Sequence, residues 1–179
     1  MKNLILILIL FILPNKLFAT EQIPDLLIIE KDTVELRELS NFPLEFLNLE
    51  FRPFNYTRQT APHTGCWRGY QAIWRVIDNK IYLEKIQRYY GDKNNDKIEN
   101  LKDFFEKNQI NTIEKDGMIL ANWVNLNLYK LKNLYSKAKY RKMILTDNWF
   151  GKKAPKNPNY VLTIKYGKIE RNNLKKSKK

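Results

Sequence analysis

Three segments of the chain share one order of apolar and turn-forming positions. They span residues 29–34, 76–81 and 164–169, and each places two turn positions between two apolar residues, with one further residue on either side. The turn positions contain Asp, Asn or Gly, which tolerate the positive φ that tight hairpin turns need. We therefore predict three β-hairpins with two-residue turns.

The alternation of apolar and polar residues beside these turns predicts a register. One face of each hairpin is apolar, as in a sheet with one face in the core and the other in water. A register shift of one residue would expose the apolar side chains to water, so the pattern specifies which face of each strand is buried. The expected apolar pairs are Trp74–Leu83 and Val76–Ile81 in the middle hairpin, and Leu27–Leu36 and Ile29–Val34 in the first.

One amphipathic helix is predicted over residues 97–108. Its apolar residues recur at helical spacing on one face. Asp96 is a natural N-cap, and Glu99, three residues later, completes a capping box. The residues on the apolar face are Ile98, Leu101, Phe104 and Phe105.

The other segments have weaker signals. Residues 124–129 alternate strictly and predict a strand, whereas residues 41–65 contain three prolines and predict mostly loop, with a short helical turn over 44–47. Residues 131–140 fit either a helix or a lysine-rich connection, and residues 154–159 predict a loop. The expected fold is α+β: an antiparallel β-sheet built from hairpins with one firm amphipathic helix.

Residues 1–19 have the pattern of a secretory signal peptide. Lys2 precedes an unbroken apolar run over residues 4–13, and Ala19 is the small residue that a signal peptidase requires. The run is shorter than the roughly 20 residues that span a bilayer. We expect export to the periplasm or exterior and a mature domain over residues 20–179, with retention as an uncleaved anchor as the alternative.

Composition and charge narrow the class of protein. The chain is 44% hydrophobic and has 32 basic against 19 acidic residues, which is typical of a globular and basic protein. Without Lys2 and Lys16 the mature charge is 30 minus 19, or +11. A polyanionic partner is one explanation, but lysine outnumbers arginine 24 to 8, which also fits a compositional bias. The basic tail over residues 171–179 is interpreted as a solvated end, with tethering as the alternative.

Cysteine chemistry is the first catalytic possibility. Cys66 is the only cysteine, so no internal disulfide is expected, and His63, the only histidine, lies three residues before it. A thiol nucleophile activated by histidine is one interpretation. A small buried side chain beside the sheet is the simpler one.

Metal binding has little support in the sequence. Two ligands are too few for zinc. Residues 92–96 space oxygen atoms as the start of a calcium loop does, but they are not followed by the glycine and bidentate glutamate of that motif. We therefore expect no metal and no cofactor.

The densest aromatic segment, residues 67–74, carries the candidate contact surface. Its aromatic residues would stack on sugar rings or bases if they are exposed, and would belong to the core if they are buried. The candidate ligand-binding residues are Trp67, Arg68, Tyr70, Arg75 and Tyr82.

The same segment carries a resemblance. Its order W-R-G-Y-x-A-x-W, followed by Ile81-Tyr82-Leu83, resembles a family of uncharacterised bacterial exported proteins. The later Ala121-Asn122-Trp123 and the closing segment 163–169 also fit that type of chain, so the resemblance covers most of residues 25–170. It implies no activity.

Two functions are consistent with these features. The first is a non-catalytic binding or interaction module of the envelope or exterior, whose partner is an envelope polymer or another protein. The alternative is a hydrolase that acts on an anionic cell-wall or nucleic-acid polymer. A cleft with two or more acids near Arg68 would favour the hydrolase, and a flat aromatic face would favour the binding module.

Overall fold

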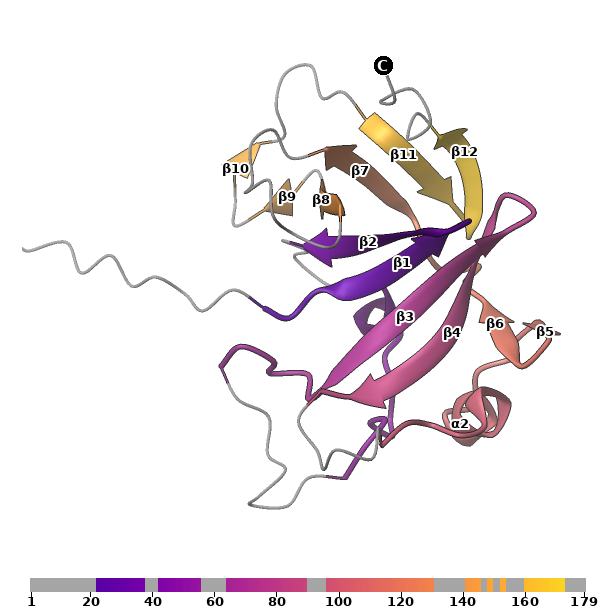
Figure 1. Ribbon diagram of the computed structural model, residues 1–179. Coiled ribbons are helices and arrows are strands. Elements are labelled where there is room, and N and C mark those ends of the chain that lie inside the picture. Colours follow the sequence, from indigo (N-terminus) through magenta and orange to yellow (C-terminus); the bar gives the residue numbers. More distant parts are fainter. Residues whose placement is uncertain are drawn as a thin grey trace, which may run out of the picture.

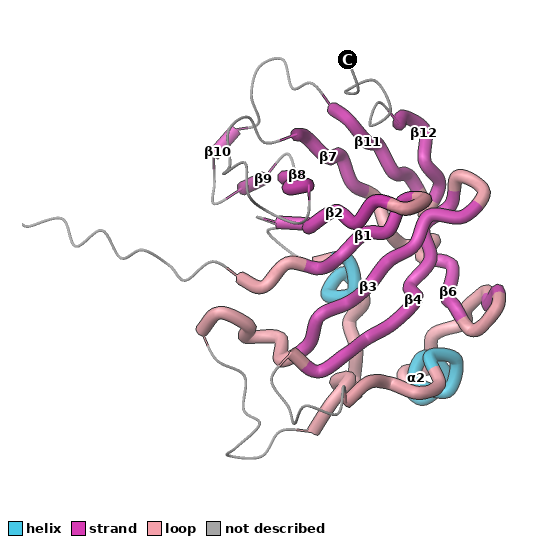
Figure 2. The backbone as a smooth tube through the Cα atoms, in the orientation of Figure 1, coloured by secondary structure: helices cyan, strands magenta, loops and turns pink. Residues whose placement is uncertain are grey.

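The structure is a computed structural model, and it describes residues 22–37, 42–55, 64–89, 96–130, 141–145, 148–149, 152–153 and 160–172. Strands dominate this part of the chain, and its helices are short (Figure 2). The helices are η1 (Pro43–Phe46) and α2 (Leu101–Lys107). The strands are β1 (Asp25–Ile29), β2 (Asp32–Arg37), β3 (Tyr70–Ile77), β4 (Lys80–Arg88), β5 (Glu114–Lys115), β6 (Met118–Leu120), β7 (Leu126–Lys130), β8 (Arg141–Leu145), β9 (Asn148–Trp149), β10 (Lys152–Lys153), β11 (Tyr160–Lys165) and β12 (Lys168–Asn172).

One curled, mixed sheet organises the described residues. Its strand order is β12-β11-β7-β8-β2-β1-β3-β4-β6-β5, and it bends like half a barrel until β12 touches β4 (Figure 1). β1 runs parallel to β3, and β2 runs parallel to β8. The expected α+β fold on an antiparallel sheet is therefore wrong. Local patterns predict the two strands of a hairpin, but they do not show how one hairpin pairs with another.

The middle and last hairpins have the predicted registers. Trp74 lies opposite Leu83, and Val76 lies opposite Ile81. In the last hairpin the pair is Ile164–Ile169, as the pattern predicts. A bulge between Ile73 and Trp74 shifts the register there, so that Ile73 lies opposite Lys85.

The first hairpin is shifted by two residues from the prediction. Leu27 lies opposite Val34, not Leu36, and the turn falls on Glu30 and Lys31. Glu30 takes the positive φ of 56°. A shift of two residues keeps every side chain on its original face, so the apolar pattern cannot distinguish the two registers.

The helix begins later than predicted. Asn100, not Asp96, is the N-cap, and its side chain accepts a hydrogen bond from the backbone N–H of Asp103 at 3.2 Å. Residues 96–98 instead extend the edge of β4, where Arg88 N–H donates to the carbonyl of Asp96 at 2.8 Å. The backbone of residues 96–98 is therefore extended along the sheet, and the helix begins after it.

The remaining local predictions have mixed outcomes. The short helical turn expected over residues 44–47 is η1, and the strand expected from residue 124 begins at Leu126. The predictions for residues 131–140 and 154–159 lie outside the described residues. No helix among the described residues is long and apolar enough to cross a membrane.

The concave side of the sheet holds the core. Trp74 is fully buried and meets Trp123 edge-on, with ring centroids 6.4 Å apart. Phe105 of α2 also packs against Trp123, with ring centroids 5.5 Å apart. The helix thus closes the core with the apolar face that its periodicity predicts.

Gly167 lies where the sheet meets itself. Its N–H donates to the carbonyl of Val124 at 3.0 Å, and its carbonyl accepts from Ile81 N–H at 2.8 Å. Its φ is +70°, and a Cβ atom here would lie 2.6 Å from the carbonyl oxygen of Ala121. Both the conformation and the close approach therefore require glycine.

We expect Gly167→Ala to destabilise the protein by about 3 kcal/mol or more, because strain at positive φ adds to a backbone clash. Gly117→Ala is the matched control, since Gly117 has a φ of +76° with no atom within 4 Å of the added Cβ. The control should cost only about 1–2 kcal/mol. Urea unfolding measures both values, and equal losses would contradict the role of the close approach.

Candidate functional site

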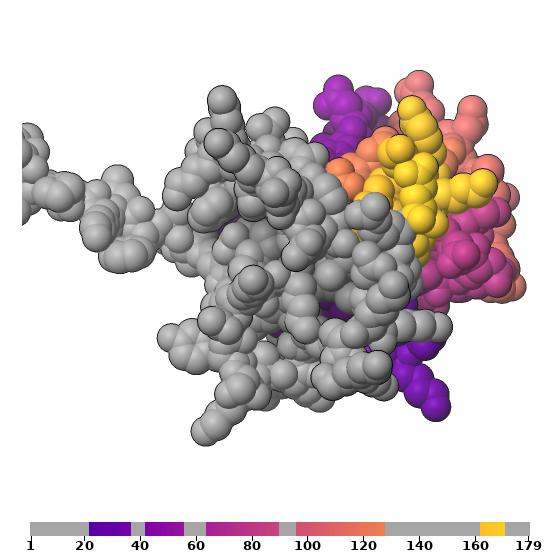
Figure 3. Space-filling view, turned by 90° about the horizontal axis from the view of Figure 1, so that it is seen from above, coloured from indigo at the N-terminus to yellow at the C-terminus, as the bar shows by residue number. Residues whose placement is uncertain are grey.

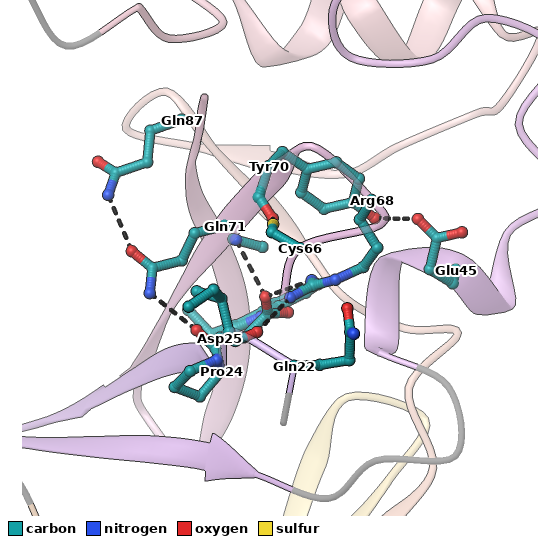
Figure 4. Close-up of polar contacts among 12 residues, drawn as sticks. Gln22, Pro24, Asp25, Glu45, Cys66, Arg68, Tyr70, Gln71 and Gln87 are labelled. Carbon is teal, nitrogen blue, oxygen red and sulfur yellow. Dashed lines mark hydrogen bonds and ion pairs between the residues drawn. The ribbon is translucent and has the colours of Figure 1, made fainter. Parts of the chain in front are cut away.

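A buried carboxylate lies at the centre of the candidate site. Asp25, the first residue of β1, has no exposed surface. One carboxylate oxygen accepts from Arg68 Nη1 at 2.7 Å and from Ala72 N–H at 3.1 Å. The other accepts from Trp74 Nε1 at 3.0 Å. Three donors from one segment thus converge on Asp25 (Figure 4).

Arg68 is the buried counter-charge. Its Nη2 donates to the carbonyl of Ile23 at 2.6 Å, and its guanidinium carbon lies 3.4 Å from the ring centroid of Phe42. Burial lowers the pKa of Arg68, but the charge of Asp25 and their hydrogen bond outweigh it and leave the pKa above its usual value. Arg68 is therefore a charged part of the interior.

Side-chain amides extend the hydrogen-bond network around Asp25. Gln71 Nε2 donates to the carbonyl of Pro24 at 2.8 Å, and Gln87 Nε2 donates to the Gln71 amide oxygen at 2.9 Å. Gln22 bonds to the backbone of Thr64 and of Trp67. Residues 64–72 therefore hold the chain at residues 22–25 through backbone and side-chain hydrogen bonds.

A second polar group lies beside Arg68. The hydroxyl of Tyr70 donates to Glu45 Oε1, and Arg52 Nη1 donates to Glu45 Oε2 at 2.9 Å. Burial raises the pKa of Tyr70 well above its usual value, and the negative charge of Glu45 raises it further. Tyr70 therefore remains a protonated donor at neutral pH.

The structure brings three of the five predicted contact residues together at the start of β3. Trp67 is 48% exposed, whereas Arg68 and Tyr70 are fully buried. Arg75 and Tyr82 face each other farther along the hairpin, where Arg75 forms two hydrogen bonds to Glu84 at 2.7 and 2.8 Å. Tyr82 is only 5% exposed. Trp67 is thus the exposed aromatic residue of the predicted set.

Asp25, Glu45 and Arg52 are site residues that the sequence analysis missed. Asp25 has a recognisable signal, because it shares its strand face with Leu27 and Ile29 and so points into the core. A carboxylate at such a position needs buried donors. Glu45 and Arg52 lie in the irregular segment and have no comparable signal.

The structure favours a buried structural thiol at Cys66. The side chain is buried, and its Sγ lies 3.4 Å from the carbonyl oxygen of Tyr70. Burial raises the pKa of the thiol. His63 lies outside the described residues, as do residues 92–95 of the calcium-like segment. Within the described residues, no group of three or more His, Cys, Asp or Glu is placed to hold a metal ion.

The acids near Arg68 are already engaged. Asp25 is buried and accepts from three donors, and Glu45 accepts from Tyr70 and Arg52. A general acid or base must reach the substrate within hydrogen-bond distance, and the buried carboxylate of Asp25 lacks that access. These two acids therefore do not form the accessible pair that hydrolysis would need.

No protein-family model, curated protein or solved structure matches this chain.

We expect Asp25→Asn to destabilise the fold by about 3–5 kcal/mol, because it leaves the charge of Arg68 buried without a carboxylate. Glu84→Gln is the matched control, since it breaks the partly exposed pair with Arg75 and should cost less than about 1 kcal/mol. Denaturant unfolding compares the two variants. A loss of stability in Asp25→Asn no larger than in the control would contradict the role of the buried pair.

We expect Cys66 to react slowly with a thiol reagent in the native protein at pH 7. The raised pKa keeps the thiol protonated, and burial blocks access to it. Labelling with Ellman's reagent should become fast and stoichiometric only in denaturant. Rapid labelling of the folded protein would instead identify a stabilised, accessible thiolate and make His63 the next residue to change.

Proposed function

We propose that this protein is an exported, non-catalytic binding protein of the cell envelope or exterior, and that it contacts its partner through the surface around Trp67. The observation that carries this proposal is the half-exposed indole of Trp67 above a buried polar network. Large aromatic side chains dominate the energetics of binding surfaces because they bury much area with little loss of entropy.

The surroundings of Trp67 suit a contact residue. The guanidinium carbon of Arg52 lies 6.0 Å from the Trp67 ring centroid and 5.8 Å from that of Tyr70. Trp67 N–H donates to the Gln22 side chain at 3.2 Å, which fixes the backbone beneath the ring. An aromatic plane and a cation on a fixed backbone form a preorganised surface, which lowers the entropic cost of binding.

The hydrolase alternative has less support. It needs accessible carboxylates, and the two acids beside Arg68 are held by donors of the protein itself. The export part of the proposal rests on the signal-peptide pattern of residues 1–19.

Pull-down from envelope extract with the purified secreted protein tests the proposal. We expect the wild-type protein to retain a polymer or protein that Trp67→Ala retains at least tenfold less, a loss of about 1.4 kcal/mol or more. Ile113→Ala, another exposed apolar residue at 59% exposure, is the control and should retain the partner normally.

Three outcomes would contradict the proposal. Equal retention of the partner by the wild-type protein and both variants would show that Trp67 is not part of the contact surface. Shortening of the retained polymer during incubation would favour the hydrolase. N-terminal sequencing should begin at Thr20 or within a few residues, and full-length protein in the cytosol would contradict export.

A further inference from the structure

Three strands meet where the sheet curls onto itself, and this junction carries an unusual set of charges. β12 pairs with β11 on one side and touches β4 on the other. Figure 3 shows the yellow surface of the β11–β12 turn beside the magenta surface of the β3–β4 hairpin. The junction lies at the opposite end of β3 from Trp67, and is therefore a separate surface.

Three lysines lie side by side across this junction. Lys165 of β11 is opposite Lys168 of β12, and Lys168 is opposite Lys80 of β4. Residues directly opposite each other on neighbouring strands share a face, so the three form one row. We call this set the lysine row.

Antiparallel strands contain two kinds of residue pair, hydrogen-bonded and non-hydrogen-bonded, and the side chains lie closer in the second kind. Lys168 and Lys80 form a pair of the second kind. Ile81 N–H donates to the Gly167 carbonyl at 2.8 Å, and Ile169 N–H donates to the Asn79 carbonyl at 2.8 Å. These bonds flank the lysine pair, which is therefore a non-hydrogen-bonded pair with its side chains near each other. Like charges in this position destabilise a sheet, so the row is an electrostatic cost to the fold.

Nearby carboxylates neutralise only part of the positive charge of the lysine row. Lys165 pairs with Glu170 at 3.0 Å, and Asp78 pairs with Lys115 at 2.9 Å. Among the described residues, no carboxylate lies within ion-pair distance of Lys80 or Lys168. The row and Glu170 together therefore have a net charge of +2.

An exposed aromatic ring lies next to the row. Tyr166 is 75% exposed, the largest value among the large apolar side chains described. Its φ is +48°, and its N–H donates to the Asn125 side chain at 2.9 Å. A bulky residue rarely adopts positive φ, and Asn would fit this turn position at lower cost. The turn thus holds a tyrosine in water where neither packing nor backbone conformation favours one.

We propose that the lysine row and Tyr166 bind a linear acidic polysaccharide, whose carboxylate, sulfate or phosphate groups pair with the lysines while a sugar ring packs on Tyr166. Neighbouring strands lie about 4.8 Å apart, so the row extends about 10 Å and fits several successive anions better than one. The ammonium groups are point charges that suit such groups, whereas bidentate recognition of nucleic-acid phosphates is better served by arginine.

This inference goes beyond the proposed function, because it names a ligand class for a second surface. It rests on the export part of that proposal, since this surface must meet polymers outside the cytosol. It uses a different surface from Trp67. The two experiments can therefore fail independently. One measures binding of a purified polymer by the lysine row, and the other measures retention of a partner from extract through Trp67.

Titration of the purified mature protein with alginate, a polymer of carboxylate sugars, tests the inference. We expect the triple variant Lys80→Gln, Lys165→Gln, Lys168→Gln to raise the Kd at least tenfold and to flatten its salt dependence. The triple variant Lys97→Gln, Lys102→Gln, Lys107→Gln removes the same charge near α2 and should change the Kd less than twofold. Neutral dextran should not bind.

The variant Tyr166→Asn distinguishes the contribution of the tyrosine ring to binding from its effect on the stability of the turn. Because Asn tolerates positive φ, this variant should keep or raise the Tm while raising the Kd for alginate several-fold. Trp67→Ala should leave alginate binding unchanged.

Each of three results would overturn the inference. If the wild-type protein does not bind alginate, an acidic polysaccharide is not the ligand of this surface. Equal weakening in the two triple variants would show that net charge alone drives binding. Tighter, row-dependent binding of single-stranded oligodeoxythymidylate than of alginate would assign the surface to nucleic acid.

Discussion

The buried carboxylate of Asp25 is the constraint on which the rest of the structure depends. A carboxylate without exposed surface is costly unless hydrogen-bond donors and a counter-charge accompany it. Arg68, Ala72 and Trp74 supply these from one short segment. The same contacts fix β1 parallel to β3, because Asp25 lies at the start of one strand and its donors lie at the start of the other.

The buried pair has a further structural role. In general, a buried ion pair can be exchanged for apolar residues with little loss. Here that exchange would leave Ala72 N–H and Trp74 Nε1 buried without an acceptor, and each orphaned donor would cost roughly 1–3 kcal/mol. Asp25 therefore specifies the alignment of two strands through several groups at once.

Local signals determined how much of the fold could be predicted. The hairpin turns at Asp78 and Gly167 are correctly placed because turn chemistry and strand alternation agree there. The first hairpin is shifted by two residues because both registers bury the same faces. The parallel pairings have no local signature, since they join segments that are distant along the chain. Sequence alone therefore could not distinguish a mixed sheet from an antiparallel one.

The same reasoning applies to the predicted site. Arg68 and Tyr70 belong to an aromatic and charged segment that fits either a surface or an interior, and their burial depends on partners elsewhere. Asp25 was the available clue, because an acid on a core-facing strand position predicts a buried donor nearby. The lysine row had no equivalent clue, because the pairing of β12 with β4 is itself non-local.

The parallel alignment of β1 with β3 also has a consequence for how the chain folds. Asp25 and Arg68 are separated by 43 positions, so their pairing must close a long loop, whereas the β3–β4 hairpin needs only a two-residue turn. Long-range pairing of this kind slows folding relative to local pairing. Until β1 docks, the hairpin has an open edge of unpaired backbone groups on β3, which is a template for association between chains. Docking of β1 therefore removes one template for aggregation from the folding sheet.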